Sequence, residues 1–341
     1  MRMSPLSETG RAHHLDVDGA RVHALDWEPE HTGIVERRVL LVHGLGANTI
    51  SWTPVGQGLA DRLGASVTAV DLIGFGRTRA LDRAATIATN RVVVERVLDT
   101  SAPAVVVGNS MGAVIAAGVA ARRPDLVDGL VLVDPALPWV RLGPADWWRA
   151  ARLAPLMVPA FARHAVAARA RVLGPERITD QTLELCLADP SRLDPAVRRR
   201  LVQLAAERFA YPEAPGAYAD AARSLLRELA TGAADRDLAA AVRACPTLLV
   251  HGEEDRLVAV DLARAAADRH GGLDLEVLDG VGHAPQLEVP KRFVEVVAAW
   301  LDARMEAWQA RDRAEPTREA EGRGARAAAS SGSPSANSSP S

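Results

Sequence analysis

The sequence predicts an α/β fold whose mostly parallel sheet is covered by helices on both faces. Two observations predict it. Short apolar runs alternate with helical patterns through residues 14–135 and again through 245–310. One of these runs, AVVVGNSMGAVIAAGVAARRP at 104–124, is a buried-strand pattern that breaks at a glycine-rich turn and restarts as a small-residue helix. Strands joined by helices form right-handed crossovers and therefore pair in parallel.

The individual elements follow from hydrophobic pattern and turn residues. Asp18-Gly19 is a strong two-residue turn signal, so residues 14–27 are expected to form a hairpin. The other expected elements are strands over 39–42, 67–71, 104–108, 130–133, 247–250 and 275–278, and helices over 51–63, 91–99, 111–122 and 290–308.

The alternation stops between Pro135 and about Ala244. This stretch is rich in Ala, Arg and Leu and is broken by prolines, which favours several short helices. Helices inserted between two such strands would lie over the ligand-binding edge of the sheet as a cap. We therefore expect a core in two parts, 14–135 and 245–310, a helical cap at 136–244, and a disordered tail at 311–341 whose composition cannot bury a core.

Composition and charge exclude several classes of protein. The 341 residues are 48% hydrophobic and 24% charged with a net charge of −3, which is ordinary for a globular protein and predicts no nucleic-acid partner. Cys186 and Cys245 form no metal or C-x-x-C pattern, so reduced, buried thiols are expected. The first residues have no apolar core, and the most apolar run, 104–121, contains Asn109 and Ser110. The sequence thus predicts a cytoplasmic protein with no membrane span; its oligomeric state stays open.

Ser110 is the residue from which a function can be argued. It lies on the turn between the strand and the helix of residues 104–122, where a hydroxyl is exposed. A G-x-S-x-G pentapeptide alone is a weak signal, because serine is common in turns, but the flanking strand and helix strengthen it. Gly108 and Gly112 fit a turn so tight that only small residues leave room, whereas Asn109 and Met111 are expected to be free to vary.

The loops after two later strands supply the partners that a nucleophilic serine needs. His251-Gly252-Glu253-Glu254-Asp255 follows the strand at 247–250, and Gly280-Val281-Gly282-His283 follows the last strand. The order along the chain is Ser, acid, His. Because parallel strands end at one edge of a sheet, all three groups can meet there. His43 and His251, each before a glycine at a strand end, are expected to be structural.

These motifs resemble the α/β-hydrolase family of esterases, lipases and C–C hydrolases. The matching pieces are LLVHGLGAN (41–48), VDLIGFGRT (70–78), VVGNSMGAVIA (106–116), LVLVDP (130–135), LLVHGEEDRLV (248–258) and GVGHAPQLEVPKRF (280–293). The resemblance implies an α/β-hydrolase sheet with a helical cap after the sixth strand. It implies Ser110 as nucleophile, His283 as general base and acid, and Asp255 as the orienting carboxylate. By the same resemblance, the N–H groups of Leu45 and Met111 form the oxyanion hole.

Two questions stay open at this level. Asp134 competes with Asp255, because some members of the fold take their acid from the loop after the sixth strand. The substrate is a small molecule, expected to be a carboxylic ester with a small-to-medium apolar acyl group, handled without metal or organic cofactor. The alternatives are C–C, thioester or perhydrolase chemistry by the same triad, and a non-catalytic binding protein that keeps the fold. Aromatic residues of the cap are expected mainly to pack its helices; they are Trp139, Trp147, Trp148, Phe161, Phe209, Tyr211 and Tyr218.

Overall fold

The structure is a computed structural model and describes residues 10–30, 37–99, 103–137 and 159–314. The chain divides into two compact units, residues 1–301 and 302–341, and the sheet lies in the first. The tail predicted at 311–341 lies largely outside the described residues, and residues 311–314 are still helical.

Eight strands form one sheet in the order β1-β2-β4-β3-β5-β6-β7-β8. Asp18 and Gly19 both have positive φ, 50° and 78°, which closes the predicted hairpin between β1 and β2. The strands are β1 (Arg11–Val17), β2 (Ala20–Trp27), β3 (Arg37–Val42), β4 (Ala65–Val70), β5 (Ala104–Asn109), β6 (Val127–Val133), β7 (Thr247–Gly252) and β8 (Leu273–Leu278).

The pairing confirms the predicted parallel sheet. β2 pairs antiparallel with β1 and β4, and every pair from β4 to β8 is parallel. β5 is central. Its Val107 lies opposite Leu41 of β3, and its Gly108 lies opposite Leu132 of β6. The carboxyl ends of β5, β7 and β8 therefore share one edge, where loops carrying Ser110, Asp255 and His283 begin.

The four predicted core helices are present, but their bounds differ and further helices occur. The helix expected at 51–63 is split into a 3₁₀ turn and α1, the helix expected at 91–99 begins four residues earlier as α2, and η2, α9 and α10 were not predicted. The elements are η1 (Thr49–Trp52), α1 (Gly56–Leu63), α2 (Ile87–Asp99), α3 (Met111–Arg122), η2 (Pro124–Leu126), α9 (Val260–Arg269), α10 (Pro285–Glu288) and α11 (Pro290–Ala314).

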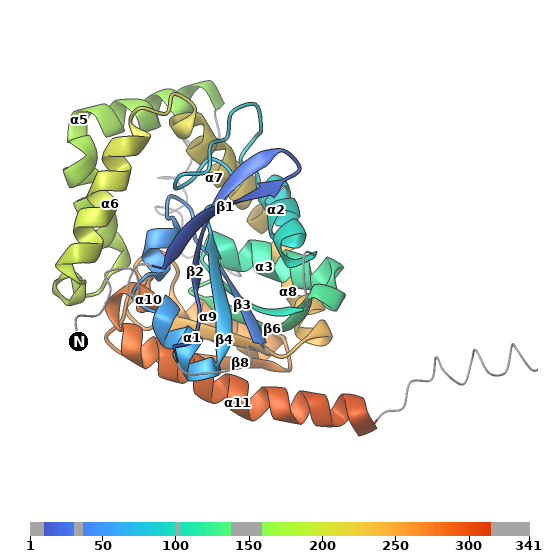
Figure 1. The fold of residues 1–341 in the computed structure, drawn as a ribbon. Coiled ribbons are helices and arrows are strands. Elements are labelled where there is room, and N and C mark those ends of the chain that lie inside the picture. Colours follow the sequence, from blue (N-terminus) through green and yellow to red (C-terminus); the bar gives the residue numbers. More distant parts are fainter. Residues whose placement is uncertain (1–9, 31–36, 100–102, 138–158, 315–341) are drawn as a thin grey trace, which may run out of the picture. The chain divides into compact units, whose positions relative to one another are not determined.

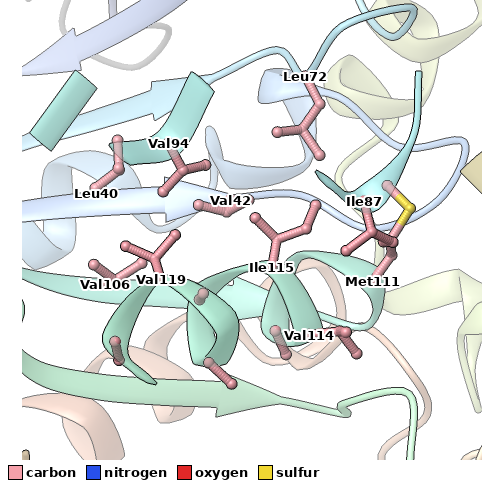
Figure 2. Packing of buried hydrophobic residues seen from close by; sticks show 14 of the residues in the cluster. Leu40, Val42, Leu72, Ile87, Val94, Val106, Met111, Val114, Ile115 and Val119 are labelled. Atoms are coloured by element: carbon pink, nitrogen blue, oxygen red, sulfur yellow. The ribbon is translucent and has the colours of Figure 1, made fainter. Parts of the chain in front are cut away.

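Helices cover both faces of the sheet. Alternate strand residues such as Leu40, Val42 and Val106 pack with α2 and α3 in one buried cluster (Figure 2). Figure 1 shows α2, α3 and α8 on one side of the sheet and α1 on the other. Trp52 packs against Phe293 with ring centroids 6.5 Å apart, which joins η1 to the start of α11. Burial on both faces explains why the central strands are continuously apolar.

The segment between β6 and β7 is helical, as predicted, and no strand occurs in the part of it that the structure describes. Short helices were predicted here, but α5 is longer than that. Its backbone kinks at Gly174, where φ is 72°. Asp194 caps α6 by accepting from the Ala196 N–H, with Pro195 in the first turn. These inserted helices are α5 (Pro159–Cys186), η4 (Pro190–Arg192), α6 (Pro195–Arg208), α7 (Ala214–Ala230) and α8 (Ala233–Ala244).

Among the residues that the structure describes, no helix combines the length and the apolar character that crossing a bilayer requires.

Candidate active site

Ser110 lies between β5 and α3 with a strained backbone. Its φ is 54° and its ψ is −114°, a combination that a residue with a side chain rarely adopts. The Ser110 N–H donates to the Val133 carbonyl at 2.9 Å, and its own carbonyl accepts from Ala113 at 3.1 Å. The hydroxyl-bearing residue is only partly buried although its neighbours on both sides are buried. This is the strand-to-helix turn that the pentapeptide predicted.

The glycines around Ser110 are required by space. A Cβ on Gly108 would lie 2.5 Å from the Gly112 carbonyl oxygen. A Cβ on Gly112 would collide with the carbonyl oxygens of Val42 and His43. A Cβ on Gly44 would lie 3.1 Å from the Ser110 Cβ, so the loop after β3 passes directly against the serine. The prediction that only small residues fit this turn is confirmed.

The expectation that Asn109 and Met111 are free to vary is wrong. Asn109 is buried, and its Nδ2 donates to the carbonyls of Val133 at 3.1 Å and His283 at 3.2 Å. The residue beside Ser110 is thereby bonded to the backbone of the predicted general base. Met111 is fully buried in the core cluster (Figure 2). Neither contact is visible in sequence, because the partners are distant along the chain.

His283 and Asp255 are paired. His283 Nδ1 donates to Asp255 Oδ2 at 2.6 Å, and both side chains are buried. The other oxygen of Asp255, Oδ1, accepts from the N–H groups of Leu257 at 2.7 Å and Val258 at 3.0 Å. Burial by itself would raise the pKa of Asp255, but the hydrogen bond and charge of His283 outweigh it and lower the pKa. Asp255 is therefore an ionised acceptor that orients the imidazole.

Asp134, the competing acid, lies behind this pair. Its Oδ1 accepts from the Gly252 N–H at 2.8 Å, while its Oδ2 is buried without a hydrogen-bond partner. One carboxylate oxygen of Asp134, one ring nitrogen of His251 and one carboxylate oxygen of Asp255 all lie within 4.8 Å of one another. Burial, followed by the charge of Asp255, raises the pKa of Asp134 well above its usual value. Burial and the charge of Asp255 thus favour the protonated form of Asp134, while the carboxylate bonded to His283 is that of Asp255.

His251 and His43 have structural positions, as expected. His251 Nε2 donates to the Val258 carbonyl at 3.0 Å, and burial lowers the pKa of His251. His43 donates from Nδ1 to its neighbour's carbonyl, Gly44 O, at 2.8 Å and accepts at Nε2 from the Leu72 N–H at 3.0 Å. Burial also lowers the pKa of His43, which keeps it neutral and able to accept. His43 therefore shapes the loop that carries Leu45.

Asp71 holds the other side of the same loop. Its carboxylate accepts from the Thr49 N–H at 2.7 Å, from His23 Nδ1 at 2.8 Å and from the Arg77 N–H at 2.9 Å. Burial opposes ionisation, but the hydrogen bond from His23 outweighs it and lowers the pKa of Asp71 overall. Two segments after β3 and β4 are in this way fixed to one buried anion.

The inserted helices contact these loops. The ring of Tyr218 on α7 lies over Gly46, since a Cβ there would be 3.1 Å from its Cε2. Tyr211 is flanked by the guanidinium groups of Arg79 and Arg208, at 4.3 Å and 5.9 Å from the ring centroid, and Phe209 is 45% exposed. Packing thus accounts for two of the predicted cap aromatics, whereas Trp139, Trp147 and Trp148 lie outside the described residues, as does the side chain of Phe161.

Both cysteines are free thiols. Cys245 is buried as expected, but Cys186 at the end of α5 is only half-buried as a residue. Burial raises the pKa of each thiol to about 12. Both thiols are therefore protonated at neutral pH.

A strained serine at the end of a central parallel strand, with a histidine–aspartate pair in the loops at the same edge of the sheet, defines the class of α/β serine-hydrolase-like proteins. Residues 37–290 match the family described as alpha/beta hydrolase fold, and the chain belongs to this family. Among its relatives is a pimeloyl-[acyl-carrier protein] methyl ester esterase of Chromobacterium violaceum, 31% identical over 269 residues, with 77% of this chain and 94% of the relative covered. Lipase LipV of Mycobacterium tuberculosis is 30% identical over 276 residues, with 78% of this chain and 96% of the lipase covered.

Solved structures show the same fold. Cfl2 from Burkholderia cenocepacia has a TM-score of 0.71 at 21% identity and covers 88% of this chain and 98% of its own. The haloalkane dehalogenase DatA from Agrobacterium tumefaciens has a TM-score of 0.68 at 22% identity, with 88% of this chain and 99% of the dehalogenase covered. These likenesses show the α/β-hydrolase fold; the homologous esterase and lipase support a hydrolase.

Proposed function

We propose that the chain is a serine hydrolase that cleaves a carboxylic ester with a small-to-medium apolar acyl group through an acyl-enzyme intermediate. The single observation that carries the proposal is that a strained Ser110 and a buried His283–Asp255 pair, bonded at 2.6 Å, follow parallel strands that end at one edge of the sheet. Asn109 adds to this observation, because its bond to the His283 carbonyl joins the loop of the proposed base to the turn of the proposed nucleophile.

In the proposed mechanism, Ser110 Oγ attacks the ester carbonyl while His283 Nε2 takes its proton. Asp255 stays ionised and stabilises the imidazolium. The N–H groups of Leu45 and Met111 bind the oxyanion, a contribution worth about 3 kcal/mol for one donor in comparable enzymes. His283 then protonates the leaving alcohol and activates water to release the acid. The position of Gly44 against Ser110 supports this assignment of Leu45.

The proposed apolar acyl group is supported by the character of the inserted helices, which we propose act as a cap. Leu183, Leu187 and Val197 from the inserted segment pack in one buried cluster with Ile50 and Ala284 from the core. A cap that meets the loops with aliphatic side chains favours an uncharged acyl chain over a charged one. Both named relatives, an esterase and a lipase, act on esters by their names. The predicted cytoplasmic location stays a prediction.

The proposal is tested with a fluorophosphonate probe and a series of p-nitrophenyl esters from acetate to decanoate. Wild-type protein is compared with Ser110→Ala and with Ser66→Ala. Ser66 lies in β4, and this control removes a hydroxyl that donates to Glu28. We expect labelling and turnover in wild type and Ser66→Ala, none in Ser110→Ala, and an optimum at a short or medium chain.

Other outcomes redirect the proposal. Labelling of Ser110 without ester turnover would indicate C–C, thioester or perhydrolase chemistry by the same residues. An absence of labelling in wild type would contradict the triad and favour the non-catalytic binding protein.

A further inference from the structure

Glu288, at the end of α10, is a buried carboxylate outside the proposed triad. Its side chain has no exposed surface. Oε2 accepts from the N–H groups of Gly282 at 2.9 Å and Ala188 at 3.1 Å, and Oε1 accepts from the Asp189 N–H at 2.8 Å and Arg192 Nη1 at 3.3 Å. A buried carboxylate is costly unless donors surround it, and four donors fill the accepting positions of its two oxygens.

These donors come from two places that are distant in sequence. Gly282 directly precedes His283. Ala188, Asp189 and Arg192 belong to segment 186–192, which runs from the last residue of α5 to the end of η4. The carboxylate therefore bonds the loop of the proposed base to the inserted helices. Within α10 itself, the Glu288 N–H donates to the Ala284 carbonyl at 3.1 Å, so the acceptor is fixed on a short rigid turn.

Further contacts join the same two segments. The His283 N–H donates to the Cys186 carbonyl at 2.6 Å, and Arg192 Nη1 also donates to the Gly280 carbonyl at 2.8 Å. Gly282 is packed so closely that a Cβ there would lie 2.5 Å from the Cys186 oxygen. The backbone of residues 280–283 is thus held against segment 186–192 along its length.

We propose that Glu288 is a positioning residue for His283, coupling the place of the imidazole to the docking of segment 186–192. The inference rests on the proposed function, since it assumes that His283 is the base. Among the described side chains the ring bonds to Asp255, so its remaining placement depends on the backbone that Glu288 helps to hold. Displacing a catalytic group by about 1 Å can lower a rate by about 10²-fold.

The test compares Glu288→Gln with Glu254→Gln. The amide of Gln places two donors where the structure needs an acceptor, whereas Glu254 is an exposed glutamate of a neighbouring loop. For a p-nitrophenyl ester we expect kcat of Glu288→Gln to fall by about 10- to 100-fold with KM changed by less than about threefold. Glu254→Gln should match wild type.

A second readout separates positioning from stability. The proton between His283 Nδ1 and Asp255 gives a low-field NMR resonance, which we expect to shift or broaden in folded Glu288→Gln and to persist in Glu254→Gln. A variant that melts at a lower temperature but keeps wild-type kcat and the wild-type resonance when folded would overturn the proposal.

Arg192→Met keeps the test decisive if Glu288→Gln does not fold. Arg192 is 42% exposed, so its replacement spares the core. We expect the same loss of kcat at a smaller size, and non-additivity with Glu288→Gln, because both act on one carboxylate. Unchanged kcat in Arg192→Met would overturn the proposal. If wild type neither labels nor turns over, the proposed function fails, and the NMR resonance alone decides whether Glu288 positions His283.

Discussion

The turn after β5 and the loop after β8 carry the two reacting groups of the proposed triad, and they are built in different ways. The turn of Ser110 is held by close backbone packing, with Gly108 against Gly112 and Gly112 against the backbone carbonyls at the end of β3. The loop of His283 is held by hydrogen bonds with Asn109, Cys186 and Glu288, of which the first two are distant along the chain. One side of the site is thus specified mainly by steric packing around glycines, and the other mainly by hydrogen bonds.

The largest expected effect tests the side chain that orients His283. Asp255→Asn should lower kcat by about 10⁴-fold, because the amide cannot stabilise the imidazolium and favours the wrong tautomer. Asp134→Asn should stay within a few-fold of wild type, since Asp134 does not bond to His283 and its surroundings raise its pKa. Steady-state kinetics on one p-nitrophenyl ester measures both. A large loss in Asp134→Asn with a mild loss in Asp255→Asn would exchange their assignments.

The steric side of the comparison is tested by Gly112→Ala. Its methyl group collides with two backbone carbonyls that cannot swing away, so we expect a loss of about 3 kcal/mol in the free energy of unfolding. Urea denaturation measures it, with Gly216→Ala on α7 as the matched control, because no atom lies within 4 Å of a Cβ at Gly216. Equal stability of the two variants would show that the turn is not sterically determined.

Asn109→Ala removes the link between the two regions. Losing two buried hydrogen bonds to backbone carbonyls should lower the free energy of unfolding by about 1–3 kcal/mol. Because one of those bonds holds the His283 carbonyl, kcat should also fall more than KM rises. Denaturation and kinetics on the same preparation check both, and a stability loss with wild-type kcat would show that the link has no effect on the base.

The last prediction concerns the pH dependence of stability. The folded protein keeps the Asp134 proton above the ordinary pKa of 3.8, whereas the unfolded chain releases it. Stability therefore falls as pH rises from about 4, by at most about 1.4 kcal/mol per pH unit for one proton. Asp134→Asn should lack this fall in urea titrations between about pH 4 and pH 7. Identical slopes for wild type and variant would mean that Asp134 is ionised.

The sequence was informative where structure is determined locally. The Asp18-Gly19 turn, the parallel strands and the Gly108–Gly112 turn were predicted because each depends on neighbouring residues. Boundaries were less certain: α2 begins before the predicted helix, and residues 51–63 divide between η1 and α1.

The missed residues act over long distances along the chain. Nothing near Asn109 indicates that its amide reaches a carbonyl 174 positions later. One feature of the sequence points to Glu288. It stands between the apolar residues Leu287 and Val289, and a charge that is buried with such neighbours requires partners. Its partners on segment 186–192 could not be named without the fold.

The two high-pKa thiols make this chain convenient for chemical labelling. With Cys186 and Cys245 protonated at neutral pH, maleimide reagents should ignore the native protein. A cysteine introduced at an exposed position of α6 would then be the single reactive thiol. A fluorophore attached there could report whether the inserted helices separate from the sheet, without any substitution of the native residues that hold His283.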